Sequence, residues 1–258
     1  MTEQQPGIEE FRPRDLVLNE ILGRARRENR TVLSEIESKQ VLAEAGLDCT
    51  ETRLARTPAE AVSLSEAFGY PVVLKISSQD ITHKSDAGGV EVNLKNAAEV
   101  QTAYDGIMRS AQRHFPQARI EGISVQRMAG KGIEVIMGMT TDPNFGPVLM
   151  FGLGGILVEI LQDVAFGIAP LENKDAAEMI DEIKGKKLLE GYRGQDCADR
   201  SCLENMLLRL SAFVDGKPQI AEIDMNPVFA RSDGATVVDA RIILAAPVRP
   251  EPKQPVRP

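Results

Sequence analysis

The chain has 258 residues, a formal net charge of −8 and a hydrophobic content of 43%. This length allows one large or two smaller globular units with a substantial core. An acidic chain lacks the basic footprint of a nucleic-acid or membrane-surface binder, so we expect neither partner. Three cysteines without metal-ligand spacing, and no apolar run long enough to span a bilayer, favour a cytoplasmic enzyme.

Capping signals and apolar runs in the first half of the chain predict a compact β/α unit. Residues 1–33 are charged, and we expect them to form an N-terminal extension with one helix. Capping boxes predict helices over residues 34–45 and 57–68, and Asn96 caps a third helix. Apolar runs around these helices predict strands at residues 72–76, 90–94 and 120–128.

The second half of the chain is rich in predicted strands and indicates a larger domain around a central sheet. Helices are predicted to start after Asn173 and Asp199, and strands are predicted at residues 132–137, 147–151, 156–161, 219–225 and 236–239. We therefore expect a main subdomain of residues 34–48 and 128–246, a smaller subdomain of residues 49–127, and a proline-rich tail of residues 247–258.

His83, one of two histidines in the chain, lies in a polar loop between two predicted strands. The strand before it contains Lys75 among apolar neighbours, although lysine is rarely buried without a partner. A phosphate group could be that partner, whereas a lysine at a strand end can also extend its ammonium group to water. We expect Lys75 and His83 to face a shared opening.

Gly154 and Gly155 follow a predicted strand, and their amides could form a nest around an anion. A tight turn that requires positive φ explains the same pair equally well. The segment does not fit the G-x-G-x-x-G fingerprint of a dinucleotide site, and the chain has no P-loop motif. Both of those nucleotide-binding classes are therefore excluded.

Asn226 and Asp239 follow two neighbouring predicted strands in the C-terminal part of the chain. Their oxygen atoms suit Mg²⁺, which usually takes one or two protein ligands beside phosphate oxygens. Alternatively, Asn226 and Pro227 form a simple turn and Asp239 is a surface acid. Residue chemistry alone leaves both interpretations open.

Seven motifs follow one another at residues 69–75, 83–90, 125–128, 142–147, 151–159, 189–194 and 222–227. In this order they resemble the ATP-grasp β subunit of the nucleoside-diphosphate-forming acyl-CoA synthetases (acetate–CoA ligase, ADP-forming), relatives of succinyl-CoA synthetase. The resemblance implies an α+β protein with the ATP-grasp fold, whose two α/β subdomains clasp the nucleotide. Residues 49–127 would form a lid whose closure excludes water.

The resemblance also implies roles for individual residues. Nucleotide contacts are implied for Lys75 at the phosphates, Gln126, Arg127 and Met128 at the adenine, Glu134 at the ribose, and Gly154 and Gly155 near phosphate. Asn226 and Asp239 would bind Mg²⁺. His83 corresponds to a histidine that carries a phosphoryl group in the family.

In this family the reaction interconverts acyl-CoA, ADP and phosphate with acid, CoA and ATP through phosphohistidine intermediates. The family's CoA site lies on an α subunit, so an α2β2 complex is expected. Two alternatives stay open: a stand-alone ATP-grasp carboxylate ligase and a non-catalytic nucleotide-sensing subunit. Gly167 stands where family members commonly have arginine, which removes a bidentate phosphate donor and bears on turnover or nucleotide choice.

Overall fold

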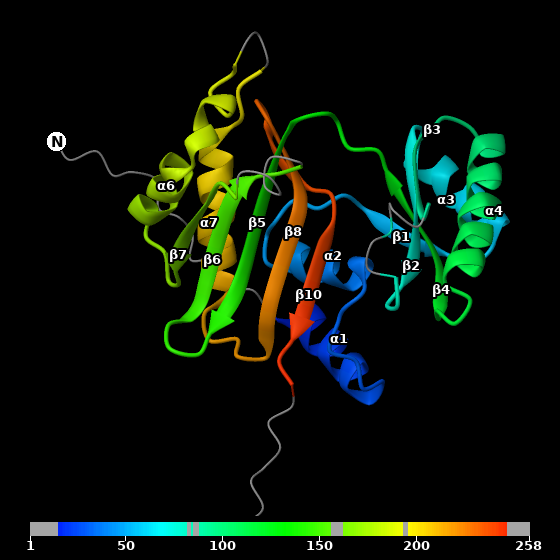
Figure 1. Cartoon of the computed structure of the whole chain (residues 1–258), viewed down its shortest axis with the longest axis horizontal. Helices are drawn as coiled ribbons and strands as arrows, with labels where there is room; N and C mark the ends of the chain where they lie inside the picture. Colours follow the sequence, from blue (N-terminus) through cyan, green and yellow to red (C-terminus); the bar gives the residue numbers. More distant parts are fainter. Residues whose placement is uncertain (1–14, 82–83, 85–87, 156–161, 193–195, 247–258) are drawn as a thin grey trace, which may run out of the picture.

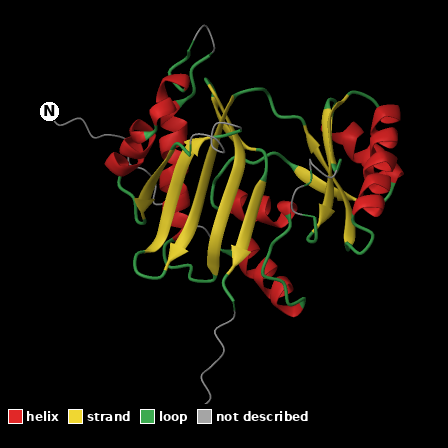
Figure 2. Ribbon diagram, viewed as in Figure 1, coloured by secondary structure: helices red, strands yellow, loops and turns green. Residues whose placement is uncertain are grey.

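The computed structural model describes residues 15–81, 84, 88–155, 162–192 and 196–246, which form two lobes (Figures 1 and 2). The helices are α1 (Leu16–Arg27), α2 (Glu35–Glu44), α3 (Pro58–Phe68), α4 (Ala97–His114), α6 (Asn173–Glu182), the 3-10 helix η1 (Lys184–Leu188) and α7 (Arg200–Val214). The strands are β1 (Thr52–Ala55), β2 (Val72–Ser78), β3 (Val90–Leu94), β4 (Ile120–Arg127), β5 (Ile133–Asp142), β6 (Gly146–Leu153), β7 (Val164–Ile168), β8 (Ile220–Arg231), β9 (Gly234–Val237) and β10 (Ala240–Leu244).

The smaller lobe is an antiparallel sheet with strand order β1-β4-β2-β3, and helices α3 and α4 pack against it. Its apolar core is separate from that of the larger lobe and includes Val72, Leu74, Ile76, Ile107 and Ile123. Strand β2 lies between β4 and β3, so its central residues are buried, including Lys75. The sheet therefore holds a charged side chain in the middle of an apolar strand.

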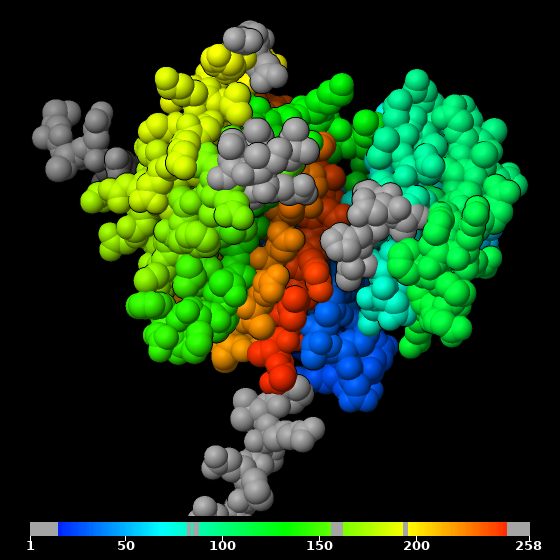
Figure 3. Space-filling view, viewed as in Figure 1, coloured from blue at the N-terminus to red at the C-terminus, as the bar shows by residue number. Residues whose placement is uncertain are grey.

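The larger lobe is an antiparallel sheet with strand order β10-β8-β5-β6-β7, and β9 pairs with β8. Helix α7 begins after Asp199, as predicted, and helix α6 begins at Asn173, one residue earlier than predicted. Leu203, Leu207 and Leu210 lie on the buried face of α7. The space-filling view shows β8 and β10, in orange and red, in the part of this lobe that lies toward the smaller lobe (Figure 3).

Side-chain caps fix the starts of the helices. The Ser34 hydroxyl accepts the Glu37 N–H at 3.2 Å, and the Glu37 carboxylate accepts the Ser34 N–H at 2.9 Å. This reciprocal pair is the predicted capping box. Thr57 also caps α3 as predicted, because its hydroxyl accepts the Glu60 N–H. The Glu60 carboxylate, however, accepts the N–H of Arg56 and not that of Thr57, so the reciprocal bond of a capping box is made one residue earlier.

Two parts of the predicted organisation differ from the structure. Helix α1 lies in the expected N-terminal extension, but Leu18, Ile21 and Leu22 are buried in the core of the larger lobe. The Glu44 carboxylate also accepts the first backbone N–H groups of α1 at 2.8 to 3.2 Å. Residues 16–33 are therefore part of the larger lobe, because α2 supplies both an apolar surface and a cap for α1.

The C-terminal strands also differ from their prediction. Asn226 and Pro227 lie inside β8 and do not form a turn, and a further strand, β10, follows Asp239. The strand predicted at residues 156–161 lies outside the described residues. Among the described residues, no helix is both long and apolar enough to cross a membrane.

Candidate functional site

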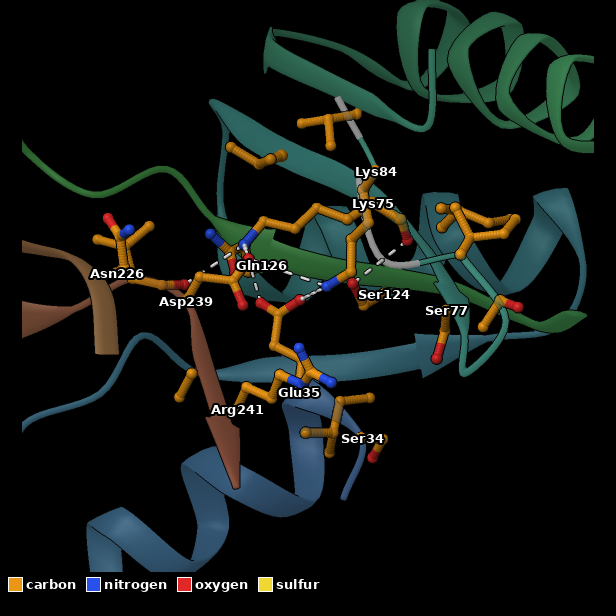
Figure 4. A pocket seen from close by; sticks show the side chains of 18 of the residues that line it. Ser34, Glu35, Lys75, Ser77, Lys84, Ser124, Gln126, Asn226, Asp239 and Arg241 are labelled. Carbon is orange, nitrogen blue, oxygen red and sulfur yellow. Dashed lines mark hydrogen bonds and ion pairs between the residues drawn. The ribbon is translucent and has the colours of Figure 1, made fainter. Parts of the chain in front are cut away.

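A cavity of about 820 Å³ lies where the two lobes face each other. The smaller lobe lines it with β2, β3 and β4, and the larger lobe lines it with the start of α2, β8 and the segment from β9 to β10. This volume is in the range of sites for small molecules and cofactors. Figure 4 shows that the charged side chains of the cavity converge from both lobes.

Lys75 reaches this cavity from the buried strand β2, and its residue is 6% exposed. Its Nζ donates to Glu35 Oε1 at 2.8 Å and to Asp239 Oδ2 at 2.9 Å. Both carboxylates belong to the larger lobe, so the lysine crosses from one lobe to the other. The unusual lysine of the predicted strand is therefore buried and ion-paired.

Glu35 stands at the centre of this charge network, with a side chain that is 6% exposed. Its Oε1 accepts from Lys39 and Lys75, both at 2.8 Å, and its Oε2 accepts from Lys84 at 2.9 Å. Asp239 lies 3.9 Å from the Lys84 ammonium. We call Glu35, Lys39, Lys75, Lys84 and Asp239 the Glu35 cluster; its three cations and two anions give a net charge of +1.

The protonation of the cluster follows from burial and ion pairing. Burial alone would raise the pKa of Glu35, but Lys75, Lys39 and Lys84 outweigh it and lower this pKa. Burial would lower the pKa of Lys75, but Glu35 and Asp239 raise it above its usual value. For Lys39 burial prevails over Glu35, so its pKa is lowered. Glu35 is therefore ionised, with charged Lys75 beside it.

Gln126, Arg127 and Met128, which the resemblance places at the adenine, form a segment that we call the hinge. Gln126 is buried in the site, and Arg127 lies outside it. Gln126 on β4 is 1% exposed, and its Oε1 accepts from Lys39 at 2.8 Å. Met128 lines the cavity, and its N–H donates to the carbonyl of Pro71 at 3.0 Å. Arg127 between them is exposed and does not line the cavity. A backbone contact of this hinge with a purine remains a prediction.

Asn226 and Asp239 both line the cavity and lie side by side, because the N–H of Asn226 donates to the carbonyl of Asp239 at 3.2 Å. Asp224 lies two residues before Asn226 and lines the same cavity. Burial is the main cause that raises the pKa of Asp224, and the carboxylates of Glu222 and Asp239 raise it further. Hard oxygen donors in such surroundings fit Mg²⁺.

Glu134, Gly154 and Gly155 form a group where β5 begins and β6 ends, and they do not line the cavity. The amide of Gly154 donates to the carbonyl of Glu134 at 2.7 Å, so that amide already has an acceptor. Gly155 has a φ of 63°, and a Cβ on it would lie 2.8 Å from Glu134 Oε2. A glycine at 155 is thus explained by its turn and its close contact, while the predicted nucleotide contacts of this group stay untested.

His83 lies outside the described residues, and so does its predicted orientation toward Lys75. Gly167 is described and lies on the buried side of β7, where a Cβ would be 2.6 Å from Met179 Sδ. An arginine at this position would require the side chains of Met179 and Leu171 to move. Gly167 does not line the cavity, so its direct effect on nucleotide choice is not supported by this geometry.

Sequence reasoning missed Glu35, Lys39 and Lys84 as members of the site. Glu35 and Lys39 have the i,i+4 spacing of a surface ion pair, and Glu35 lies inside a capping box that already explained an acidic first turn. Lys84 was visible only as a neighbour of His83.

Comparison with known proteins identifies the class of this fold. The model of the ATP-grasp domain matches residues 24–244. The β subunit of acetate–CoA ligase [ADP-forming] I of Pyrococcus furiosus is 47% identical over 87% of this chain and 97% of that subunit. The chain therefore belongs to the ATP-grasp family, in the group that contains the β subunits of ADP-forming acetate–CoA ligases.

Solved structures agree with this assignment. Dinucleotide-forming acetyl-coenzyme A synthetase 1 of Ca. Korarchaeum cryptofilum, in complex with coenzyme A, Ca-AMPCP and HgCl+, matches with a TM-score of 0.86 and 46% identity over 88% of this chain and 99% of that chain. Another structure of that enzyme, with coenzyme A and Mg-AMPPCP, has its phosphohistidine segment pointing towards the nucleotide binding site. It matches with a TM-score of 0.79 and 43% identity over 88% and 99% of the two chains. The predicted ATP-grasp fold is thus confirmed.

Proposed function

We propose that this chain is the nucleotide-handling β subunit of an ADP-forming acyl-CoA synthetase that acts on acetate-type acids. With its partner it interconverts acyl-CoA, ADP and phosphate with the free acid, CoA and ATP. The observation that carries this proposal is the interlobe cavity. Lys75 and Lys84 enter it from the smaller lobe, and the oxygen-bearing side chains of Asp224, Asn226 and Asp239 line it on the larger lobe. The identity to β subunits of this enzyme class supports the choice of reaction.

The chemistry of the cavity suits transfer of a phosphoryl group to ADP. Such a transfer depends mainly on positioning and on neutralising the charge of the phosphate oxygens. Lys75 and Lys84 supply two ammonium groups for this purpose, and burial strengthens their attraction to an anion. Asn226 and Asp239 would hold Mg²⁺, which when bound neutralises further phosphate charge.

His83 is the proposed phosphoryl carrier on this subunit. A ring nitrogen of His83 accepts a phosphoryl group from a phosphohistidine of the partner, whose N–P bond breaks and whose imidazole leaves, and passes the group to the terminal phosphate oxygen of ADP. The N–P bond breaks as the new O–P bond forms, and the imidazole is released. The adjoining Lys84 lies in the cavity, which supports transfer at this position. Closure of the smaller lobe would exclude water from the transfer.

The partner in this proposal is a CoA-binding α subunit in an α2β2 complex. The name of the Pyrococcus relative, a β subunit, supports a partner chain. The test is to mix the purified chain with its cognate α subunit and to measure ATP formed from acetyl-CoA, ADP and phosphate with Mg²⁺. ATP should form only when both subunits are present. Activity of this chain alone with an acid and an amine would favour the stand-alone ligase, and tight Mg-ATP binding without transfer would favour the sensor.

The carrier role of His83 has its own test. The His83→Ala complex should lose ATP synthesis, and phosphate label from acetyl-CoA and labelled phosphate should no longer appear on this subunit. His114, an exposed residue at the end of α4, provides the matched control, and His114→Ala should keep both properties. Full ATP synthesis by the His83→Ala complex would rule out this carrier.

A further inference from the structure

The carboxylate of Glu35 binds the two lysines of the smaller lobe that enter the cavity. Each oxygen of the carboxylate binds one of these lysines: Oε1 accepts from Lys75 at 2.8 Å, and Oε2 accepts from Lys84 at 2.9 Å. Figure 4 shows both ammonium groups turned toward this carboxylate. One acidic group on α2 therefore sets the relative position of two cations from the other lobe.

Glu35 is itself held in place from behind. Lys39 donates to Glu35 Oε1 at 2.8 Å but does not line the cavity. The same ammonium group also donates to Thr50 and Thr52 at 2.9 Å and to Gln126 at 2.8 Å. Lys39 is thus anchored to the smaller lobe, and it restricts the position that the Glu35 carboxylate can take.

Lys84 is anchored through its backbone as well as through its side chain. The Gly89 N–H donates to the Lys84 carbonyl at 2.8 Å, and the Ile76 N–H donates to the Gly89 carbonyl at 2.7 Å. A Cβ on Gly89 would lie 2.6 Å from Ile76 Cγ2, so glycine permits this close approach to β2. The backbone of Lys84 is thereby tied to the residue that follows Lys75.

We propose that Glu35 is a positioning residue that holds Lys75 and Lys84 side by side as one clamp for the phosphates of the nucleotide. The inference rests on the proposed function and adds two residues, Glu35 and Lys84, to its phosphate site. A lysine ammonium is a mobile point charge on a flexible chain, with three donors. One donor of each lysine is fixed on Glu35. Lys75 also donates to Asp239 at 2.9 Å and, over 3.4 Å, to the carbonyl of Val238, which a phosphate oxygen would replace. Holding the lysines in this way reduces the ordering needed during transfer.

A merely structural role for Glu35 is the competing explanation, and Glu37 provides the matched control. Glu37 is on the same turn of α2, is similarly buried, and binds Arg24 and Arg30 instead of cavity lysines. Loss of either carboxylate leaves cations without their anion: the cavity lysines for Glu35, and Arg30 with the more exposed Arg24 for Glu37. The two substitutions should therefore both lower stability, but only the one at Glu35 should disturb the lysines of the cavity.

The experiment compares Glu35→Gln, Glu35→Asp and Glu37→Gln chains, each assembled with the α subunit, at temperatures well below their melting points. Glu35→Gln should lower kcat/KM for ADP at least about tenfold and leave the KM for acetyl-CoA within about twofold. Glu35→Asp should recover part of this loss, because the charge remains. Glu37→Gln should stay within about twofold of wild type.

Wild-type kcat/KM for ADP in the Glu35→Gln complex, or an equal loss in the Glu37→Gln complex, would overturn the inference. If Glu35→Gln does not fold, Glu35→Asp decides the question: a loss confined to ADP supports positioning, and a wild-type value contradicts it. If the wild-type complex forms no ATP, the proposed function fails by itself. A crystal structure of the chain with Mg-ADP then decides this inference: both lysines should contact phosphate and Glu35, and phosphate bound without Lys84 would overturn it.

Discussion

The first turn of α2 carries two buried carboxylates that serve different regions of the molecule. Glu37 binds Arg24 and Arg30 and also accepts the Ser34 N–H, so its partners all belong to the larger lobe. Glu35 binds Lys39 on its own helix and two lysines of the smaller lobe at the edge of the cavity. Two carboxylates that are two residues apart on one helix thus differ in their partners: Glu37 makes contacts within its lobe, and Glu35 makes contacts between the lobes.

The cations differ in a way that matches these surroundings. Arginine presents a planar fork of donors, and Arg30 uses two of its nitrogens on the two Glu37 oxygens, both at 2.9 Å. Lysine presents a compact charge whose donors can change partners. We infer that the Glu37 contacts stabilise the fold, whereas the Glu35 contacts leave their lysines available to a ligand.

Among the residues that contact Glu35, replacement of Lys75 should cause the largest loss of activity. In Lys75→Met, Glu35 keeps Lys39 and Lys84 as partners, so we expect the chain to remain folded. Loss of a buried phosphate donor should lower kcat/KM for ADP about 10²- to 10³-fold. Initial rates of ATP formation and a thermal melt check both statements. A Lys75→Met complex with wild-type kcat/KM would remove Lys75 from the phosphate site.

Replacement of Asp239, a proposed Mg²⁺ ligand, should have a smaller effect on activity than replacement of Lys75, and the effect should be confined to the Mg²⁺ dependence of the rate. Asp239→Asn removes the carboxylate that faces Lys75 and is proposed to bind Mg²⁺. We expect the Mg²⁺ concentration at half-maximal rate to rise about tenfold or more, because an amide is a weaker ligand than a carboxylate. Titration of the rate with Mg²⁺ at saturating ADP measures this. Asp233→Asn, at an exposed residue, is the control and should not shift the curve.

Lys84 tests whether the clamp has a second member. In Lys84→Gln the Glu35 carboxylate keeps Lys39 and Lys75 as partners, so the change should cost little stability. Loss of its charge should lower kcat/KM for ADP about five- to tenfold and should leave the KM for acetyl-CoA unchanged. Lys131→Gln is a matched change at an exposed lysine outside the cavity. Equal rates for the two variants would mean that Lys75 acts alone.

Glu37→Gln should have the smallest effect on activity and should change stability instead. Burial alone would raise the pKa of Glu37, but the hydrogen bond from Arg30 and other contacts lower it. The ionised form therefore stabilises the fold above the unfolded pKa of about 4.3, and this contribution falls as pH drops toward the lowered folded value.

Urea denaturation of the wild type and Glu37→Gln at several pH values measures this contribution. At pH 7 the variant should lose about 2 kcal/mol in its free energy of unfolding, as expected when a carboxylate loses charge-assisted hydrogen bonds to partly exposed cations. The difference between the two proteins should shrink as the pH falls below about 4. A difference that stays constant from pH 7 to pH 3 would show that the charge of Glu37 does not stabilise the fold.

Local signals in the sequence predicted many of the elements and part of the site. Ser34, Thr57, Asn96 and Asp199 cap helices where they were expected to, because a cap depends on residues only three apart. Lys75 was identifiable because a lysine inside an apolar strand requires a partner. The neighbours Asn226 and Asp239 were also correctly paired, since β8 and β10 are joined through the short strand β9.

Features that depend on contacts between distant segments were not predictable in this way. The capping-box spacing assigns Glu37 to the Ser34 N–H, but nothing local shows which distant cations bind Glu35 or Glu37. Their partners lie on α1 for Glu37 and on β2 for Glu35, so only the packing of the lobes separates the two roles. Helix α1 was misjudged for the same reason, since its apolar face is short and its cap comes from Glu44.

A double-substitution experiment tests most directly whether Glu35 acts through the lysine of β2. kcat/KM for ADP is measured for complexes that contain Glu35→Gln, Lys75→Met or both, with Glu37→Gln combined in the same way as control. If Glu35 positions Lys75, the fold-loss caused by Glu35→Gln should be smaller in the Lys75→Met background than in wild type, because only the part that acts through Lys84 remains. Losses that multiply in the double variant would show that Glu35 acts independently and would contradict the account.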